Sequence, residues 1–326
     1  MTIQIFEKNC LFYNNKTIIY GEYIGSKKDV KILFHDTFDF KVIFSLGNYK
    51  DFYIEIPNKI TFIHGIQLIN NNNKIFKKDV YLKFPFENCD LLINPNSYII
   101  TTMCKDYTSR LDEWIEYNIN LGFHGIVIFN NDKNESNNIN ESTNYFNRNI
   151  TYQDIYNKYK GKVWIVDFPY STLNGNYWNT LQVISLTISV NEFRNKCSKI
   201  ALIDADEFIY VPSYNNICNF FLKNKGKTIT MKSNLLTNKS NNDIINNNIL
   251  DISTYIGGNK YEKTILDTSQ LNEMEFIVSP HRHPSQIKFE KNEIIHYHCW
   301  FNDRLPYKDN MIYFEELKNF KKTYKT

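Results

Sequence analysis

The feature that most constrains the fold is an alternation of two sequence patterns between residues 98 and 203. Short, nearly continuous apolar runs alternate with segments whose apolar residues recur at helical spacing. Such runs are typical of strands covered on both faces, and the helices between them are typical crossovers of a parallel sheet. We therefore expect an α/β, Rossmann-like domain whose mainly parallel sheet carries helices on both faces. The predicted strands are Tyr98–Cys104, Gly125–Phe129, Lys162–Asp167 and Lys199–Ile203, and the predicted helices are Ser109–Leu121, Thr151–Lys160 and Tyr177–Lys196.

Residues 1–94 have a different texture. Short β-prone runs are separated there by turns rich in Asn, Asp, Gly and Lys. The turn-forming Asn94-Pro95-Asn96 follows these runs and is a natural boundary. We predict a smaller β-rich N-terminal domain or sheet layer over residues 1–94 and the α/β domain over residues 95–326.

Charge and composition exclude several classes of function. The formal net charge is +3, and basic and acidic residues are interspersed, which argues against a nucleic-acid partner. No apolar run has the length of a transmembrane helix, and the first residues lack the pattern of a secretory signal. We therefore expect a cytoplasmic protein without a transmembrane segment.

The bias toward Asn, Lys and Ile indicates an AT-rich genome, viral or bacterial. This bias lowers the weight of the many aromatic residues as evidence for a binding surface.

A cluster of acids directly follows the strand predicted at Lys199–Ile203. Asp204, Asp206 and Glu207 lie within four positions, and Asp204 and Asp206 flank Ala205. In an extended chain these two carboxylates point to the same side and could bind one divalent cation. The alternative is a solvated acidic turn, which such a short motif often is.

The predicted topology bears on this choice, because ligands of parallel α/β sheets bind beyond the carboxyl ends of the strands. Polar residues follow two other predicted strands, as Lys105-Asp106 and Asn131-Asp132. A single converging acidic site is therefore favoured over an isolated turn.

Further candidate residues lie near the end of the chain. Lys263 begins a short β-prone run, where it could contact a phosphate or be an ordinary surface lysine. His281 and His296 belong to two His-x-His motifs, and alternate strand positions share a face on which a metal could bind. Histidines packed at strand ends are the structural alternative.

The motifs of residues 98–303, taken in order, resemble the GT-A glycosyltransferases, in particular glycosyltransferase family 92 and the related glycosyl-transferase-2-like group. The matching stretches are Cys104-Lys105-Asp106-Tyr107, Leu111–Tyr117, Leu121-Gly122, Ile126–Asp132, Gln182, Ala201–Phe208, Lys263-Thr264-Ile265, His281 and His296-Tyr297. Two departures are Asp106-Tyr107 in place of an Asn-Glu pair and Asn118 in place of a histidine. The resemblance implies the GT-A fold for this region.

The resemblance also implies roles for individual residues. Asp204 and Asp206 would bind Mn²⁺ or Mg²⁺, with His296 or His281 completing the coordination. The residues implied at the nucleotide sugar are Lys105, Asp106, Asn131, Asp132, Gln182 and Lys263. The candidates for the base that deprotonates the acceptor are Glu207, Glu275 and Asp303.

The function implied is metal-dependent transfer of a sugar, with inversion, from a nucleoside-diphosphate donor to a glycan or protein acceptor. UDP is the expected nucleotide and galactose the first candidate sugar. Two alternatives remain open, a non-catalytic carbohydrate-binding or structural protein and a metal-dependent phosphoryl-transfer enzyme. The oligomeric state is not indicated by the sequence.

Overall fold

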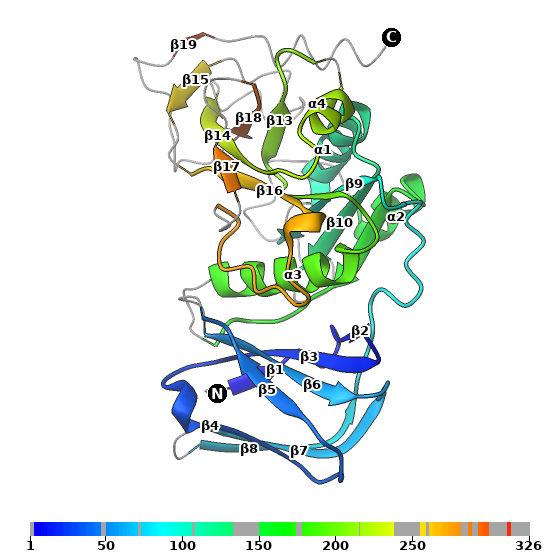
Figure 1. Ribbon diagram of the computed structural model, residues 1–326, viewed down its shortest axis with the longest axis vertical. Coiled ribbons are helices and arrows are strands. Elements are labelled where there is room, and N and C mark those ends of the chain that lie inside the picture. Colours follow the sequence, from blue (N-terminus) through cyan, green and yellow to red (C-terminus); the bar gives the residue numbers. More distant parts are fainter. Residues whose placement is uncertain are drawn as a thin grey trace. The chain divides into compact units, whose positions relative to one another are not determined.

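The computed structural model describes residues 3–46, 50–70, 73–105, 108–132, 150–173, 178–214, 216–237, 255–258, 261–281, 286–288, 293–299 and 312–313. The chain divides into two compact units (Figure 1). The first unit comprises residues 1–89, 166–193 and 273–278, and the second comprises residues 90–165, 194–272 and 279–326. The boundary predicted near residue 94 is not tested by this division and stays a prediction.

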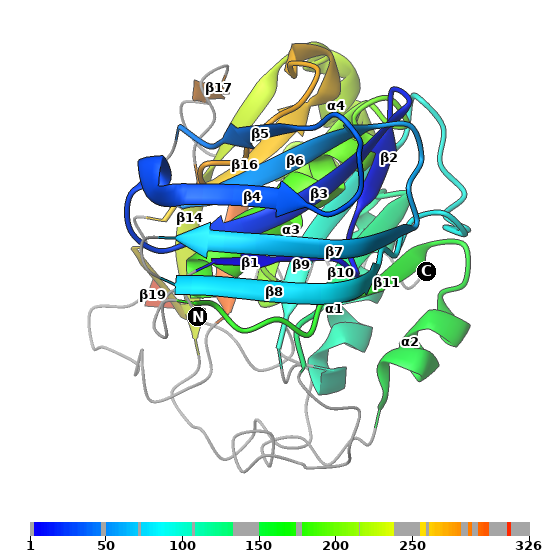
Figure 2. The same cartoon turned by 90° about the horizontal axis from the view of Figure 1, so that it is seen from below.

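The first unit contains two antiparallel sheets (Figure 2). The first sheet has the order β1-β3-β6-β5, with β2 paired to β3, and the second has the order β4-β7-β8. The unit also includes helix α3 (Trp178–Phe193). The strands are β1 (Ile3–Ile5), β2 (Leu11–Tyr13), β3 (Lys16–Tyr23), β4 (Val30–Phe34), β5 (Lys41–Phe44), β6 (Asp51–Pro57), β7 (Phe62–Asn70) and β8 (Asn73–Tyr81).

The two sheets of the first unit share one hydrophobic core. Residues of β4 and β7 alternate between buried and more exposed, as expected for an antiparallel sheet with one covered face, whereas β3 and β6 are buried over nearly their whole length. Ile19 and Ile54 come from the five-stranded sheet, and Ile63 and Leu68 come from β7; all four are completely buried. The arrangement is therefore a small β-sandwich.

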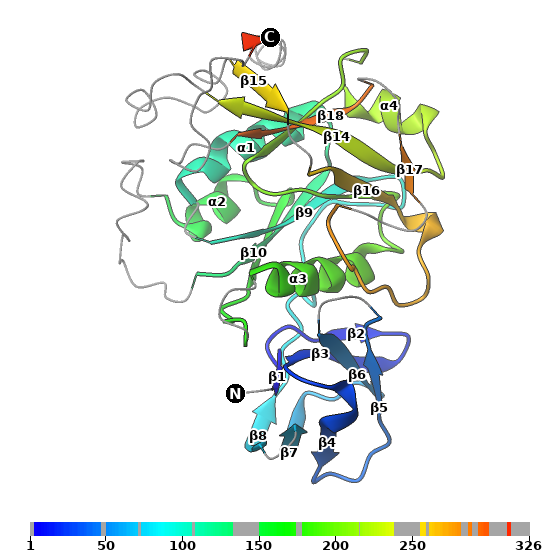
Figure 3. The same cartoon turned by 90° about the vertical axis from the view of Figure 1, so that its left-hand side faces the viewer.

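The second unit contains an 11-stranded sheet (Figure 3). Its main path is β11-β10-β9-β12-β16-β14-β15-β19, while β13, β17 and β18 join from the side. Three α-helices of this unit are α1 (Thr108–Leu121), α2 (Tyr152–Lys158) and α4 (Ile217–Lys223). The strands are β9 (Tyr98–Cys104), β10 (Gly125–Asn130), β11 (Val163–Asp167), β12 (Lys199–Leu202), β13 (Glu207–Tyr210), β14 (Thr228–Thr237), β15 (Tyr255–Gly258), β16 (Lys263–Asp267), β17 (Gln286–Lys288), β18 (Ile295–Cys299) and β19 (Ile312–Tyr313).

The prediction of a GT-A, Rossmann-like fold with a mainly parallel, helix-covered sheet is wrong. In the described part of the chain, strand accounts for 41% and helix for only 21%. β10 and β12 do pair in parallel with β9, but β16 is antiparallel to β12, and β14 is antiparallel to β16 and β15. Parallel strands need a long crossover, usually a helix. The antiparallel pairing of β14 with β16 needs no such crossover, and it makes the sheet a mixed one.

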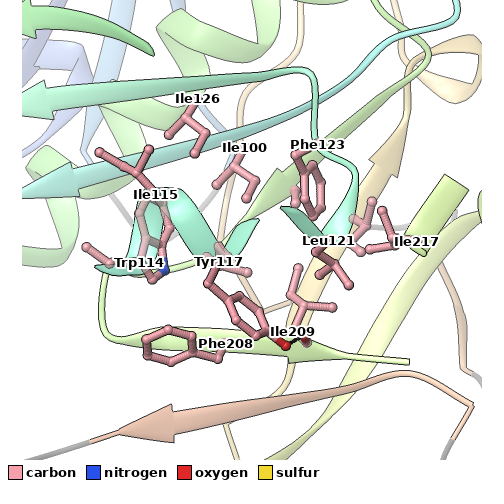
Figure 4. Packing of buried hydrophobic residues seen from close by; sticks show 14 of the residues in the cluster. Ile100, Trp114, Ile115, Tyr117, Leu121, Phe123, Ile126, Phe208, Ile209 and Ile217 are labelled. Atoms are coloured by element: carbon pink, nitrogen blue, oxygen red, sulfur yellow. Dashed lines mark hydrogen bonds between the residues drawn. The ribbon is translucent and has the colours of Figure 1, made fainter. Parts of the chain in front are cut away.

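Helix α1 joins the central strands to β13 (Figure 4). Trp114, Ile115 and Leu121 are completely buried and pack in one cluster with Ile100 and Phe208. Side chains spaced three and four apart on a helix share a face, which is why this helix can cover the sheet with a single apolar stripe.

Among the described residues, no helix has the length and apolar character needed to cross a membrane.

Helix α2 shows how the local sequence sets a helix boundary. Thr151 precedes the first turn, and its hydroxyl accepts a hydrogen bond from the Asp154 backbone N–H. The Asp154 carboxylate in turn accepts one from the Thr151 N–H at 2.9 Å. This reciprocal capping box satisfies two donors that the first turn would otherwise leave free.

Candidate functional site

The acidic stretch forms a turn between β12 and β13 at one edge of the sheet of the second unit. Leu202, the last residue of β12, pairs with Thr101 of the parallel strand β9. Asp204 N–H donates to Glu207 Oε2 at 3.0 Å, and Glu207 N–H donates to the Asp204 carbonyl at 3.1 Å. The turn is therefore closed in part by one of its own carboxylates.

Lys263 lies against this turn because β16 runs antiparallel to β12. Thr264 pairs with Leu202, so Lys263 is placed just beyond the end of β12. Its Nζ lies 2.5 Å from Asp204 Oδ2 and 3.3 Å from Glu207 Oε2, and its side chain is only 2% exposed. Burial opposes the charged form, but the charges of Asp204 and Glu207 outweigh it and raise the pKa of Lys263. The residue is a buried ammonium ion shared by two acids.

His298 reaches the turn from β18. This strand is antiparallel to β13, with His298 opposite Glu207, and Cys299 N–H donates to the Asp206 carbonyl at 2.8 Å. His298 Nε2 lies 3.1 Å from Asp206 Oδ2. Burial alone would lower the pKa of His298, but the Asp206 carboxylate raises it to about 9. In the absence of a metal, His298 and Asp206 therefore form an imidazolium–carboxylate pair near neutral pH.

The carboxylates of the turn ionise differently. Removal from water opposes ionisation of Asp204, but the charge of Lys263 and its hydrogen bond lower the pKa of this carboxyl. For Glu207, burial is the dominant influence and raises the pKa to about 7, although Lys263 acts in the opposite direction. Two neighbouring acids in different environments thus have clearly separated pKa values, an arrangement common in sites that move protons.

The ends of β9, β10 and β12 converge on this turn. Burial is the main cause of the raised pKa of the Cys104 thiol at the end of β9, and the charges of Asp132, Asp204 and Asp206 add to it. Asn131 is buried, and its N–H donates to the Cys104 carbonyl at 2.8 Å. The structure therefore brings Asn131 and Asp132 toward the acids. Lys105 is exposed beyond β9, and Asp106 lies outside the described residues.

The two histidines predicted as metal ligands have other contacts. His296 Nε2 lies 3.0 Å from the Tyr261 carbonyl, and its Nδ1 lies 3.6 Å from Glu207 Oε1. Burial and the nearby Lys263 charge lower its pKa, so it is neutral. His281 Nδ1 lies 2.6 Å from the Glu262 carbonyl. Both histidines nevertheless interact electrostatically with Asp204, since the charge of His281 helps to lower the pKa of Asp204 and the charge of Asp204 acts to raise the pKa of His296.

The sequence analysis missed His298, which is the histidine that contacts Asp206. The available signal was the His-x-His alternation, because His296 and His298 must share one face of a strand. Choosing between them required the β13–β18 register, which the sequence does not supply.

Three predicted residues remain, of which two belong to the first unit and one lies outside the described residues. Gln182, on α3, and Glu275 belong to the first unit and are both buried. Glu275 is held there by its backbone, whose N–H and carbonyl both bond to the Asn191 side chain. Asp303 lies outside the described residues.

One carboxylate oxygen at the turn is suited to a cation. Asp206 Oδ1 is buried and has no hydrogen-bond partner in the described structure, which is costly for a charged group. The described residues contain no ready cluster of three or more His, Cys, Asp or Glu ligands. Mg²⁺ is commonly bound by one or two carboxylates together with substrate phosphates and water, so Asp206 fits a cation that the substrate helps to hold, and His298 could join it only after losing its proton.

Comparisons with known proteins add no family to this description. No protein-family model matches the chain, and no curated protein matches it.

Proposed function

We propose that this protein is a metal-dependent glycosyltransferase that moves a sugar from a nucleoside-diphosphate donor to a glycan or protein acceptor. UDP is the nucleotide and galactose the first sugar to test, and the transfer inverts the anomeric centre. The observation that carries the proposal is the Asp206–His298 pair, in which Asp206 Oδ1 is buried without a hydrogen-bond partner among the described residues, within the electrostatic influence of the buried Lys263.

The charges of the cluster suit the departure of a diphosphate. A Mn²⁺ or Mg²⁺ ion held by Asp206 and, after loss of its proton, by His298 would neutralise negative charge on the leaving group. Lys263 adds a fixed positive charge in the same cluster, where burial strengthens electrostatic interactions. Asp204 holds the ammonium group in place through the 2.5 Å contact.

The acceptor hydroxyl must also lose a proton. Glu207, one of the three predicted carboxylates, lies in the cluster, and its pKa of about 7 suits a proton acceptor at neutral pH. Its side chain is 2% exposed and its Oε2 accepts the Asp204 N–H, so it also positions the turn.

The proposal is tested with UDP-galactose and other UDP-, GDP- and CMP-linked sugars, each with and without Mn²⁺. Thermal unfolding reports binding, and release of the free nucleotide reports turnover. Asp206→Ala should lose both the Mn²⁺-dependent stabilisation and the nucleotide release. Asp112→Ala is a matched control, because Asp112 is a similarly exposed acid, 23% against 21%, in an ion pair with Lys158. Full turnover by Asp206→Ala would disprove the metal assignment.

The ion pair between Lys263 and Asp204 favours one second candidate, a non-catalytic carbohydrate-binding protein. A lysine already neutralises one of the two acids expected to bind metal. In that case a sugar nucleotide would stabilise the protein to the same extent with and without Mn²⁺, and no nucleotide would be released.

A further inference from the structure

The outward face of the three-stranded sheet in the first unit carries side chains of an unexpected kind. The exposed face of an antiparallel sheet is normally polar. Here Leu33 on β4, Phe76 on β8 and Tyr81 on β8 are 48%, 50% and 66% exposed. The residues between them, such as Ile32 and Val80, are buried in the sandwich core, so the sheet has a clear inner and outer side.

The outer face carries two pairs of contacting rings and a leucine, which we call the aromatic platform and define as Leu33, His35, Phe62, Phe76 and Tyr81. The ring centroids of His35 and Phe76 are 4.9 Å apart, and so are those of Phe62 and Tyr81. The three strands β4, β7 and β8 that carry the platform lie side by side (Figure 2).

Gly65, at the middle of β7, is required for this packing. A Cβ atom at this position would lie 3.0 Å from Phe76 Cζ and 3.2 Å from His35 Cγ. The two rings therefore lie over the bare backbone of Gly65. A glycine within a strand often marks such a close approach.

Two lysines lie at one end of the platform and a third lies within it. Lys31 and Lys74 pair with the same β7 residue, Ile69, from opposite sides, and Lys78 pairs with Gly65. All three are exposed, and their side chains form no ion pair or hydrogen bond in the described part of the chain. Their positive charge is therefore available to an anionic partner.

The distribution of charge selects the kind of partner. The opposite end of the platform has an acid, since Asp36 Oδ2 accepts the His64 N–H at 2.9 Å. Nucleic acid carries a phosphate at every nucleotide and requires cations along its length. A protein interface would have a contiguous apolar centre with a polar rim, whereas here Gln67 and Lys78 lie between the rings. A chain of sugars with an acidic group at one end matches rings, amide and lysines in this order.

We propose that the aromatic platform binds an oligosaccharide whose acidic sugar lies at the lysine end, over Lys31 and Lys74. Apolar sugar faces pack on the rings, and hydroxyl groups bond to side chains such as Gln67. From Phe62 in the platform to Ile69 between Lys31 and Lys74, β7 spans about 23 Å at roughly 3.3 Å per residue, long enough for several sugars. This site is separate from the acidic turn and does not rest on its activity.

The test measures binding to the full chain by calorimetry, using a panel of tetrasaccharides of different hexoses. Each is supplied with a terminal uronic acid and in a form in which that carboxyl is reduced to an alcohol. We expect at least one acidic tetrasaccharide to bind at least tenfold more tightly than its reduced form. Phe76→Ala and Lys74→Ala should each weaken this binding at least fivefold, and Gly65→Ala should weaken it by displacing the two rings.

Two controls make the test decisive. Phe12→Ala removes another exposed ring of the same unit, 42% exposed, on the other sheet, and should leave binding unchanged. Asp206→Ala should also bind normally, so that a failure of the proposed transferase activity is distinguishable from a failure of this site. Absence of binding across the panel, equal binding by Phe76→Ala, or tighter binding of an eight-nucleotide single strand would overturn the proposal.

Discussion

Two lysines of the second unit are each only 2% exposed, yet their surroundings differ. Lys199 donates to Asp267 Oδ2, to the Asn224 carbonyl and to the Lys227 carbonyl, at 2.8 to 3.1 Å. These three acceptors use all three donors of its ammonium group. Lys263 instead lies among acids in a cluster where Asp206 Oδ1 and His296 Nδ1 are buried without hydrogen-bond partners in the described structure.

The difference separates a structural ion pair from a candidate site. A complete buried network fixes the positions of its members and leaves nothing for a ligand to satisfy. An incomplete network retains desolvation costs that a ligand could relieve. We therefore assign Lys199 a purely structural role, joining the end of α4 to β16, and Lys263 a role in the proposed function.

The largest expected effect on stability comes from breaking the complete network. Lys199→Met leaves Asp267 buried without its cation, which should lower the free energy of unfolding by about 3–5 kcal/mol. Urea denaturation measures this loss. Lys158→Met is the control, because Lys158 is 54% exposed in its pair with Asp112 and should cost less than about 1 kcal/mol. Equal losses in the two variants would remove the distinction.

The corresponding change at the other lysine should act on turnover. Lys263→Met is expected to lower nucleotide release by about 10²–10³-fold, the usual effect of removing one electrostatic group from a reacting centre. Its loss of stability should be smaller than that of Lys199→Met, because the Asp204 side chain is one-third exposed and Glu207 can take up a proton near pH 7. Unchanged turnover together with a larger loss of stability would reverse the comparison.

Asp51 is a buried acid of the first unit, and its pKa tests whether burial or a charged partner decides the ionisation of a carboxyl group. Burial raises the pKa of Asp51 from 3.8 to about 7, and the nearby Glu22 adds to the increase. Because the folded state holds this proton more tightly than the unfolded state, stability should fall as the pH rises from about 4 to 7. Asp51→Asn should reduce this slope and stabilise the protein at pH 8 by about 2 kcal/mol, since three pKa units set a ceiling of about 4 kcal/mol.

Thermal or urea unfolding between pH 4 and pH 8 provides the measurement for Asp51→Asn. Asp154→Asn is a suitable control, because hydrogen bonds from Thr151 lower rather than raise the pKa of this acid. If stability changes with pH in the same way in Asp51→Asn and in the unchanged protein, the Asp51 carboxyl does not cause the loss of stability between pH 4 and pH 7.

The smallest expected effect comes from the contacts that hold β13. Tyr117→Phe removes the hydrogen bond to the Ile209 carbonyl and should cost about 1 kcal/mol. Trp114→Phe removes the 2.8 Å bond from Nε1 to the Glu207 carbonyl and also leaves a void in the core, so it should cost about 2 kcal/mol. Urea denaturation of the two single variants and the double variant measures both. A loss above about 4 kcal/mol in either one would show a role beyond a single hydrogen bond.

Local patterns of the sequence predicted several elements well. The strand predicted at Tyr98–Cys104 and the cap at Thr151 both occur as predicted, because apolar runs and capping residues act over a few neighbouring positions. The overall fold was not predicted. The sequence after Lys227 lacks a strong periodic signal, yet it forms the long strand β14 that directs the antiparallel half of the sheet.

The candidate site shows the same limit. That acids end a buried strand was visible in the sequence, because Asp204 and Asp206 directly follow an apolar run. That Lys263 and His298 would reach them depended on antiparallel pairing over a separation of many residues. Register of this kind is set by packing of the whole sheet, and no short motif encodes it.

The contacts of α1 with β13 have a consequence for how this part of the protein could change. Trp114 and Tyr117 bond to backbone carbonyls of Glu207 and Ile209 rather than to their side chains. Every amino acid offers the same carbonyl, so the helix anchors the strand whatever residue stands at position 207. A substitution at position 207 could therefore replace the acid with a different side chain while β13 keeps its hydrogen bonds to α1.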